Sequence, residues 1–344
     1  MNNTTLRIAV LTINRPSLDA AKRLRNVLAE HRCDIYTKEG LAKENRDTYG
    51  YEKLDDVLPH IWASYDALIA LIAVGALIRK IAPLLRDKTS DPAVVALNLE
   101  LTRVIPLLGG HLGGANTLAQ TLADRLPSCI NFVTTATDQT GTPAFDTLAK
   151  ARKWRIVNLS RLATLSNAMI NGEPVYVHTS ETLFKSLPTH PTLRLASPSH
   201  PLTPERSVVI SPHIHSQALT LVPKIALGIG CNRGIDAQAV LEAIEAFLFK
   251  RQLRIEDIET IASFDAKRDE NGLLEAARKL NKPLRFFSKE EINALTSDFS
   301  PSASTRFFGL KGVAEPSAVL ASRYRTLSFE KDVYFSSITI AGAY

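Results

Sequence analysis

Cysteine is scarce in this sequence of 344 residues, which contains only Cys33, Cys129 and Cys231. These three lie far apart, without a C-x-x-C spacing or a paired histidine spacing, so neither a disulfide framework nor a zinc site is predicted. Disulfides belong to oxidising compartments, and the low cysteine content therefore favours a reducing one. We expect a cytoplasmic protein without a metal site of its own.

Long hydrophobic runs are also missing. The longest one extends from Ala67 to Ile78 and is followed by Arg79 and Lys80. It is shorter than the ~20 apolar residues that a membrane-spanning helix needs. The first residues lack the pattern of a signal peptide. We therefore expect no membrane association.

Charge of one sign is not concentrated anywhere in the chain. The 41 Lys and Arg residues exceed the 35 Asp and Glu residues enough to give a net charge of +6. No Lys/Arg block occurs and no aromatic residues alternate with basic ones, as they usually do on nucleic-acid-binding surfaces. This argues against nucleic acid as a partner and fits a small polyanionic ligand better.

Length and periodicity indicate an α/β protein of several domains. Apolar residues make up 45% of the chain, and 344 residues exceed the usual size of one domain. Short apolar runs alternate with helical patterns, which is typical of parallel sheets. The strands expected in the first part of the chain cover residues 7–13, 33–37, 67–73, 94–97, 104–108 and 130–134, and the helices follow Pro16 and cover 76–85 and 117–126. In such sheets ligands bind beyond the carboxyl ends of the strands, so the loops after Ala73, Leu108 and Thr134 should converge on one face.

Three domains are expected. Residues 1–157 form an amino-terminal α/β domain with a parallel sheet, and residues 158–221, which prolines interrupt repeatedly, form a small β-rich middle domain. Residues 222–344 form a carboxy-terminal α/β domain. In the middle domain His213 and His215 lie among Ser and Pro without a third ligand nearby, which favours a solvated loop over a metal site.

The most distinctive stretch is Leu107–Asn116, where an apolar run ends, four glycines occupy positions 109–114 and a helical pattern begins. Glycine there permits positive φ and brings backbone N–H groups close to a ligand, while the helix directs its positive end to the same point. His111 and Asn116 add polar groups. We interpret the stretch as a ligand-binding turn between a strand and a helix.

A second glycine-rich stretch follows the expected strand 224–227. Gly228, Gly230 and Gly234 lead to Asp236, a good helix N-cap, and to a helix over 240–249. The glycine spacing misses G-x-G-x-x-G by one residue, and no acidic residue ends a strand about 20 positions later. A nicotinamide-dependent oxidoreductase is therefore disfavoured.

Several motifs are distributed over nearly the whole chain, at residues 74–79, 81–85, Asp87 with Lys88, 91–95, 110–116, 134–138, 228–231, Arg233 with Gly234, and Asp265 with Lys267. In these motifs the chain resembles the family of the cobalamin biosynthesis protein CbiG. Its carboxy-terminal part resembles the CbiG domain that also occurs alone as CobE. The middle region matches most weakly.

The resemblance implies an enzyme of the anaerobic route to vitamin B12, a hydrolase acting on a carbon–carbon bond. The implied activity is that of a cobalt-precorrin-5A hydrolase, which opens the ring A δ-lactone and releases C20 with its methyl group as acetaldehyde, giving cobalt-precorrin-5B. Cobalt would arrive in the tetrapyrrole substrate, so no cofactor is expected. Transient contact with neighbouring methyltransferases of the pathway is the implied protein interaction. A non-catalytic corrinoid carrier is the alternative.

Lactone hydrolysis needs a base that activates water and donors for the developing oxyanion. His111 and Asp138 are the candidate catalytic residues, and the alternatives for the base stay open. Gly113 and Gly114 could donate to the oxyanion. Arg79, Lys88 and Arg233 suit the carboxylates of the substrate. Cys231 could be a nucleophile, although a packed small residue is favoured. The full set of expected substrate-binding residues is Gly75, Arg79, Lys88, Gly110, Gly113, Gly114, Asn116, Thr135, Thr137, Gly228, Gly230, Cys231, Arg233, Gly234, Asp265 and Lys267.

Overall fold

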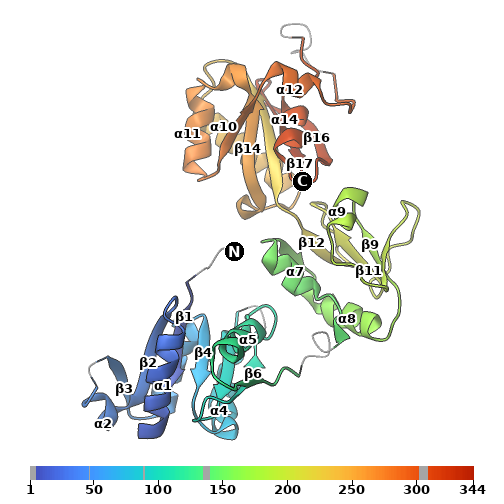
Figure 1. Cartoon of the computed structure of the whole chain (residues 1–344). Coiled ribbons are helices and arrows are strands. Elements are labelled where there is room, and N and C mark those ends of the chain that lie inside the picture. The colour runs from blue at the N-terminus through green and yellow to red at the C-terminus, as the bar shows by residue number, and fades with distance from the viewer. Residues whose placement is uncertain (1–4, 46, 88–89, 135–139, 302–308) are drawn as a thin grey trace. The chain divides into compact units, whose positions relative to one another are not determined.

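The computed structural model describes residues 5–45, 47–87, 90–134, 140–301 and 309–344. The chain divides into two compact units, residues 1–147 and 148–344 (Figure 1), and each is described by itself. The fold is α/β, as the alternation in the sequence predicts, with one sheet in the first unit and two in the second. In the described part of the chain, no helix is long and apolar enough to cross a membrane.

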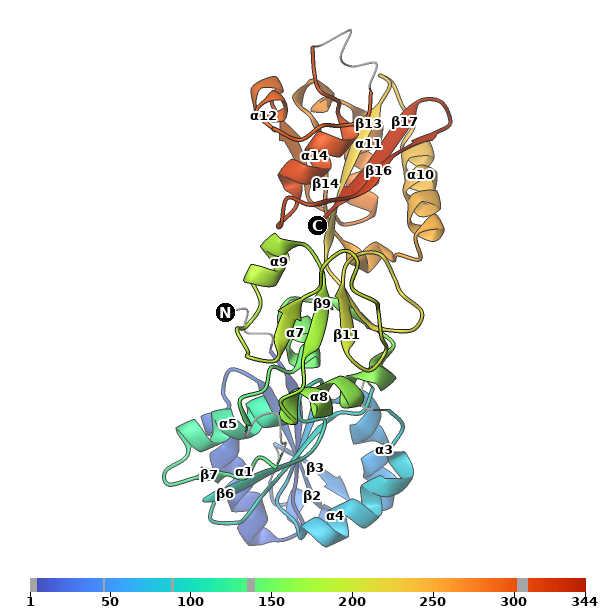
Figure 2. The same ribbon diagram turned by 90° about the vertical axis from the view of Figure 1, so that its right-hand side faces the viewer.

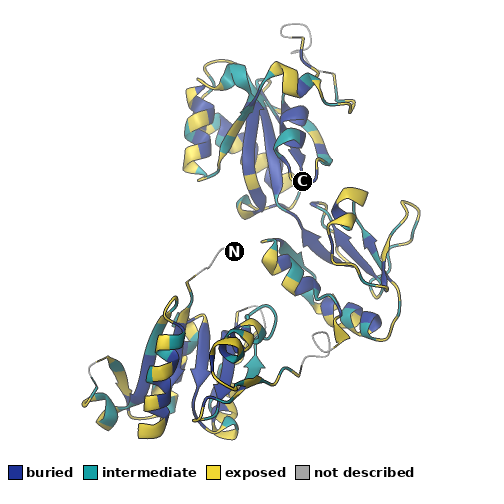
Figure 3. Cartoon of the chain, viewed as in Figure 1, coloured by how far each residue is buried: buried dark blue, intermediate teal, exposed yellow. Residues whose placement is uncertain are grey.

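The first unit is built on a seven-stranded sheet with the order β3-β2-β1-β4-β5-β6-β7. The strands are β1 (Arg7–Leu11), β2 (Arg32–Lys38), β3 (Thr48–Tyr51), β4 (Ala67–Ala70), β5 (Ala93–Leu97), β6 (Arg103–Leu108) and β7 (Ile130–Asn131). The apolar runs at β4 and β5 are completely buried because helices cover both faces of the sheet. Figure 3 shows the same contrast between buried strands and half-exposed helices.

Four of the helices bury this sheet from two sides. Ile8 and Val10 belong to one core cluster together with residues of α1 (Arg15–Val27) and α5 (Ala115–Arg125). Ala9 and Leu11, which point the other way, belong to a second cluster with residues of α3 (Leu54–Ser64) and α4 (Val74–Ile81). The unit also contains the short helix α2 (Glu39–Ala42) and the 3-10 turn η1 (Ala82–Leu84).

The direction of β6 corrects one expectation. β1, β2, β3, β4 and β5 are parallel, whereas β6 is antiparallel to β5, with Val94 opposite Leu108 and Leu97 opposite Val104. β7 is parallel to β6. The loop after β6 therefore lies at the edge where β5 begins, and the loop after β4 lies at the opposite edge. The prediction that the loop after Ala73 shares a face with the loop after Leu108 was therefore wrong, and the loop after Thr134 lies outside the described residues.

The first sheet of the second unit has the order β10-β9-β11-β12-β8. Its strands are β8 (Arg155–Val157), β9 (Val175–His178), β10 (Leu193–Leu195), β11 (Ser207–Ile210) and β12 (Leu219–Val222), and β8 alone is antiparallel to its neighbour. The accompanying helices are η2 (Leu159–Arg161), α8 (Leu162–Ile170) and α9 (Glu181–Lys185). The helix α7 (Phe145–Ala151) spans the boundary, with Asp146 and Thr147 in the first unit and the residues from Leu148 on in the second. The middle domain was expected to start at residue 158. Because β8, which covers residues 155–157, pairs with β12, the sheet of this domain begins three residues earlier.

The second sheet of this unit has the order β15-β14-β13-β17-β16. Its strands are β13 (Ile225–Cys231), β14 (Ile258–Phe264), β15 (Leu284–Phe287), β16 (Leu327–Tyr334) and β17 (Ile338–Ala343). The accompanying helices are α10 (Ala237–Lys250), η3 (Ile255–Asp257), η4 (Asp265–Lys267), α11 (Asn271–Lys279), α12 (Lys289–Asn293) and α14 (Ala314–Ala321). The hairpin of β16 and β17 has no counterpart among the elements expected from the sequence.

Two glycines show how this sheet is covered. A Cβ atom on Gly228 would meet Ala314 of α14, whereas a Cβ atom on Gly342 would meet Phe247 of α10. Gly228 pairs with Ala341, so Gly342 faces the opposite side of the sheet. The helices α14 and α10 therefore cover opposite faces, as seen in Figure 2.

Candidate functional site

The loop between β6 and α5 has the backbone that its glycines predict. Gly109 and Gly114 have φ values of +67° and +90°, in the left-handed region that favours glycine, and Gly114 is the N-cap of α5. Gly113 is required for a different reason, since a Cβ atom there would lie 2.7 Å from the carbonyl oxygen of Gly109. The loop is therefore a tight turn closed by backbone-to-backbone contact.

Some backbone amides of this turn form hydrogen bonds within it, and two at the start of α5 do not. The amides of Ala115 and Asn116 donate to the carbonyl oxygens of Gly109 and Gly110, each at 3.0 Å. The amides of Gly113 and Gly114 donate to no residue that the structure describes. Two N–H groups beside the positive end of a helix form the kind of arrangement that stabilises an oxyanion.

The side chain of His111 contacts two residues at the start of α7, Asp146 and Thr147. Its Nδ1 lies 2.7 Å from the hydroxyl of Thr147 and 4.0 Å from a carboxylate oxygen of Asp146. Asp146 is 8% exposed and also accepts a hydrogen bond from the amide of Thr147. The turn thus places an oriented imidazole beside a buried carboxylate and two backbone donors, which is suited to proton transfer at an ester group.

Sequence reasoning did not single out Asp146 and Thr147. Both lie in the first turn of α7, where an acidic residue is favourable because of the helix dipole. That preference could have predicted the helix start but not the contact with His111, which is 36 residues away from Thr147 along the chain. Asp138, the other expected catalytic residue, lies outside the described residues together with Lys88, Thr135 and Thr137.

Gly75 and Arg79 are not brought to His111. Both are exposed on α4, which begins beyond the carboxyl end of β4, at the edge opposite to the end of β6. Arg79 folds back on its own helix and donates through Nη1 to the carbonyl oxygen of Gly75 at 2.9 Å. Asn116, in contrast, lies in the glycine turn, where its Oδ1 would be 2.9 Å from a Cβ atom on Gly110.

The second glycine stretch is not a single turn. Gly228 and Gly230 lie inside β13, which continues to Cys231, whereas the strand was expected to end at Leu227. A Cβ atom on Gly228 would lie 1.8 Å from the carbonyl oxygen of Ala314, and one on Gly230 would lie 2.6 Å from the hydroxyl of Thr339. These two glycines therefore permit close packing on the sheet, and the turn proper begins after Cys231.

Glu270 organises that turn. It is 5% exposed and accepts hydrogen bonds from the amides of Gly234 and Ile235 at 2.9 and 3.1 Å. Its other oxygen lies 3.7 Å from the ammonium of Lys267. Gly234 itself has a φ of +71°. Glu270 was not among the expected site residues, although it connects two that were, Gly234 and Lys267.

Cys231 lies beside this group in a form that is unsuited to attack. Burial raises the pKa of its thiol to about 11, and Glu270 acts in the same direction while Lys267 opposes it. The thiol is therefore protonated at neutral pH, and the thiolate is the nucleophile. The interpretation of Cys231 as a packed small residue is favoured.

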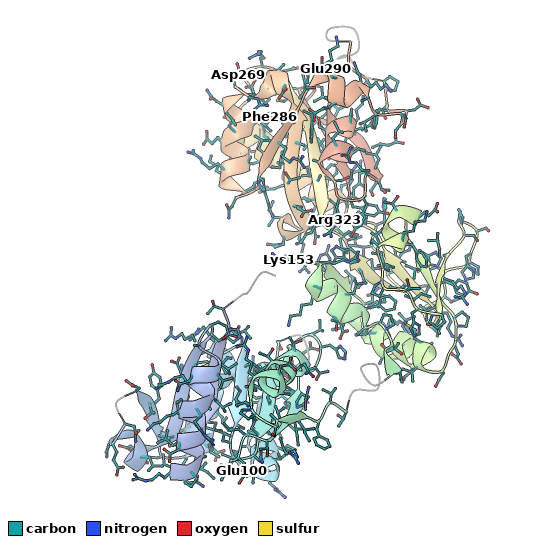
Figure 4. All side chains as sticks on the ribbon, viewed as in Figure 1. Glu100, Lys153, Asp269, Phe286, Glu290 and Arg323 are labelled. Atoms are coloured by element: carbon teal, nitrogen blue, oxygen red, sulfur yellow. The ribbon has the colours of Figure 1, made fainter. Side chains whose placement is uncertain are left out.

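The other charged residues that follow β13 and β14 form ion pairs at the surface. Arg233 pairs with Asp269 at 3.0 Å and donates to the carbonyl oxygen of Ala266, and Asp265 pairs with Arg268 at 2.6 Å. Figure 4 labels Asp269, which follows β14. The structure thus brings Cys231, Arg233, Gly234, Asp265 and Lys267 to one end of the parallel strands β13 and β14, although a role of these residues in substrate binding stays a prediction.

Replacement of Gly228 by alanine should lower the free energy of unfolding by about 1–3 kcal/mol, because the added methyl group forces α14 away from the sheet. Urea denaturation measures this loss. Gly40→Ala is the matched control, since no atom lies within 4 Å of a Cβ atom at that exposed position. Unchanged stability of Gly228→Ala would contradict the packing role of this glycine.

Three family models match successive parts of the chain. They are the amino-terminal model of cobalamin synthesis protein G at residues 56–138, the central region of cobalamin biosynthesis at 143–223 and the carboxy-terminal model of protein G at 225–343. The fold and the glycine turn define an α/β protein with a candidate site for an anionic ligand. The chain belongs to the family of the cobalamin biosynthesis protein CbiG, as its motifs predict.

Three known proteins are similar to this chain to different extents. The chain is 28% identical to a cobalt-precorrin-5A hydrolase of Priestia megaterium, over 94% of this chain and 91% of that protein. It is 30% identical to CobE of a Sinorhizobium species, over 32% of this chain and 73% of that protein. A crystal structure of a putative cobalamin biosynthesis protein G homologue from Sulfolobus solfataricus is 23% identical, covers 98% of this chain and 96% of its own, and has a TM-score of 0.40.

Proposed function

We propose that this protein acts as a cobalt-precorrin-5A hydrolase. The observation that carries the proposal is the similarity to the enzyme of that name from Priestia megaterium, which extends over nearly the full length of both chains. The substrate is accordingly a tetrapyrrole that contains cobalt. The metal belongs to this substrate, so the protein needs no cofactor of its own.

The first step of the reaction is attack of water on the carbonyl carbon of the ring A δ-lactone. A base removes a proton from the water, the C–O bond of the lactone breaks, and the ring oxygen takes up a proton, which leaves a carboxylic acid and a hydroxyl group. The hydroxyl group on C20 then loses its proton while the C–C bond between C20 and the macrocycle breaks. The electron pair of that bond stays with the macrocycle, C20 leaves with its methyl group as acetaldehyde, and the product is cobalt-precorrin-5B. The reaction consumes water and needs no redox partner.

The glycine turn supports this chemistry in the first unit. His111 is a candidate base because an imidazole can accept a proton and because the hydroxyl of Thr147 orients its ring. The amides of Gly113 and Gly114 are suitable donors for the negative charge that develops on the carbonyl oxygen. Asp138 remains the alternative base. Gly110 and Asn116 complete the turn on the side of α5.

The remaining expected substrate contacts stay predictions, and Arg79 lies at the edge of the sheet opposite to the glycine turn. Arg79, Lys88 and Arg233 are cations that can pair with its acetate and propionate groups. Transient contact with the methyltransferases that make or use the same intermediates belongs to this proposal, as does a cytoplasmic location.

Incubation of the purified protein with cobalt-precorrin-5A should release acetaldehyde in proportion to the substrate consumed, without any added cofactor and in the presence of a chelator. Enzymatic assay of acetaldehyde and mass spectrometry of the tetrapyrrole measure the two products. Verified substrate that binds without releasing acetaldehyde would contradict the proposal and favour a corrinoid carrier.

A further inference from the structure

A pocket of about 300 Å³ opens inside the second unit, away from both glycine stretches. It lies where the end of α10 and the residues after it meet β16 and the loop between β11 and β12. The residues that line it are His213, Ile214, Lys250, Arg251, Gln252 and Phe329. Two of these, Lys250 and Arg251, are cations and none is an acidic residue, so the lining favours an anion.

Arg251 is fixed in this pocket. Its guanidinium lies over the ring of Phe247 at 3.8 Å and near the ring of Phe329 at 4.9 Å, and its side chain is only 11% exposed. It donates to the carbonyl oxygen of Phe247 and, at 2.8 Å, to Asp332. Its Nε is buried and has no hydrogen-bond partner among the described residues. Because the Nε atom has almost no exposed surface, Arg251 contributes to the pocket through its positive charge and not through this donor.

Asp332 does not neutralise the pocket. The same carboxylate oxygen accepts from Arg251 and, at 3.0 Å, from Lys250, so two cations share one anion. Burial opposes ionisation of Asp332, but the hydrogen bonds from Lys250 and Arg251 keep its pKa below the usual value. One positive charge is left over. Lys250 is 64% exposed, and its ammonium can turn from Asp332 toward a ligand at low cost.

The other walls are apolar or neutral. The ring of His213 lies 4.5 Å from that of Phe329, and its Nε2 donates to the carbonyl oxygen of Ser328 at 3.0 Å. Ile214 adds an aliphatic surface. A single extra positive charge beside aromatic and aliphatic walls is complementary to a monoanion attached to an apolar body, because the charge pairs while the body displaces water from the rings.

We propose that this pocket binds a carboxylate carried on an apolar body and, resting on the proposed function, that this carboxylate is an acetate or propionate arm of the tetrapyrrole. Lys250 and Arg251 supply the charge, and Phe329 and Ile214 contact the adjoining carbon chain. The second unit then contributes a contact to substrate binding that is separate from the residues at the carboxyl ends of β13 and β14.

Titration with cobyrinic acid, a stable corrin that retains free acetate and propionate arms, tests the proposal on the full-length protein. Lys250→Met should raise its dissociation constant about fivefold, and Gln252→Glu, which adds a negative charge to the wall, should raise it tenfold or more, since each 1.4 kcal/mol corresponds to a factor of about 10. Lys185→Met is the matched control, because Lys185 is also an exposed lysine in an ion pair, with Glu181 at 2.7 Å. It should bind like the wild type.

The same titrations are made with two further ligands. Cobinamide has a corrin ring with amide side arms, and free propionate has the carboxylate without the ring. Weaker binding of cobinamide that is insensitive to Lys250→Met supports the carboxylate contact. The proposal is overturned if both pocket variants bind cobyrinic acid as the wild type does while their melting temperatures are unchanged. Saturation of the pocket by propionate, without binding of cobyrinic acid, overturns the assignment to a tetrapyrrole arm. The proposed function fails by a different result, absence of acetaldehyde release by the wild type.

Discussion

Replacement of His111 by alanine or glutamine should lower kcat for acetaldehyde release by about 10²–10⁴, the usual contribution of one general acid–base group. The side chain lies in a glycine turn with its Nδ1 beside Thr147, and it is not part of a core cluster. The fold should therefore survive the change. Steady-state assay of acetaldehyde, together with thermal melting of each variant, separates loss of chemistry from loss of structure.

Glutamine distinguishes two roles for this residue. It retains a hydrogen-bonding group but cannot titrate, so an enzyme that only needs His111 for orientation should keep most of its activity in His111→Gln. His60→Gln is the matched control, because His60 is an exposed histidine on α3, in the same unit. Equal kcat values for His111→Gln and the wild type would contradict proton transfer by this residue.

Thr147→Val adds a test of the contact itself. It removes the hydroxyl at 2.7 Å from Nδ1 with little change in volume, so it should lower kcat less than His111→Ala does, while leaving KM close to the wild-type value. A pH profile assigns the base. Loss of the acidic limb of kcat/KM in His111→Gln, but not in Asp138→Asn, identifies His111, and the reverse result identifies Asp138.

The strands and helices that surround the glycine turn could be predicted because each is a local pattern. The buried runs at β4 and β5 and the amphipathic spacing of α1 and α5 depend only on residues within one element. The direction of β6 could not be predicted in this way. Only five residues, 98–102, connect Leu97 to Arg103, which is too short for the crossover that a parallel neighbour needs. The length of the connection therefore indicates the antiparallel pairing that is found, with Val94 opposite Leu108, whereas the alternation of strands and helices does not.

The carboxy-terminal glycines show a second limit of sequence reasoning. Gly228 and Gly234 look alike in the sequence, yet the first accommodates α14 and the second adopts a positive φ at a turn. The difference depends on Ala314, which lies 86 positions after Gly228 along the chain. Glu270 was missed for the same reason, since its two backbone partners, Gly234 and Ile235, are distant in sequence.

The expected domain boundary between residues 157 and 158 could not be checked against local patterns either, because Arg155 forms a contact that is distant in the sequence. Arg155 of β8 forms a bidentate pair with Asp257 of η3, with Nη2 2.6 Å and Nε 3.1 Å from the carboxylate. The pair joins the two sheets of the second unit, and no local pattern around Arg155 indicates it. The segment 155–157 therefore belongs structurally with the residues that follow it.

Asp257→Ala should lower the free energy of unfolding by about 3–5 kcal/mol, because removing one member of a buried pair leaves the other charge without a partner. The carboxylate of Asp257 is 2% exposed, the side chain of Arg155 is 17% exposed, and Asp257 also accepts from the amide of Arg254 at 2.9 Å. Urea denaturation followed by near-ultraviolet circular dichroism measures the loss, with the second unit unfolding at the lower urea concentration.

Two further variants decide whether the charge pair itself is responsible. Glu181→Ala removes an equally short but exposed ion pair with Lys185, in the same unit, and should leave the midpoint nearly unchanged. Arg155→Met combined with Asp257→Leu removes both charges and replaces them with apolar volume, so it should recover much of the stability that Asp257→Ala loses. The variants Arg155→Met and Asp257→Leu are also measured singly. If the double variant loses as much free energy of unfolding as these two single variants lose together, the loss comes from packing and from the amide of Arg254, and the ion pair is not what joins the two sheets.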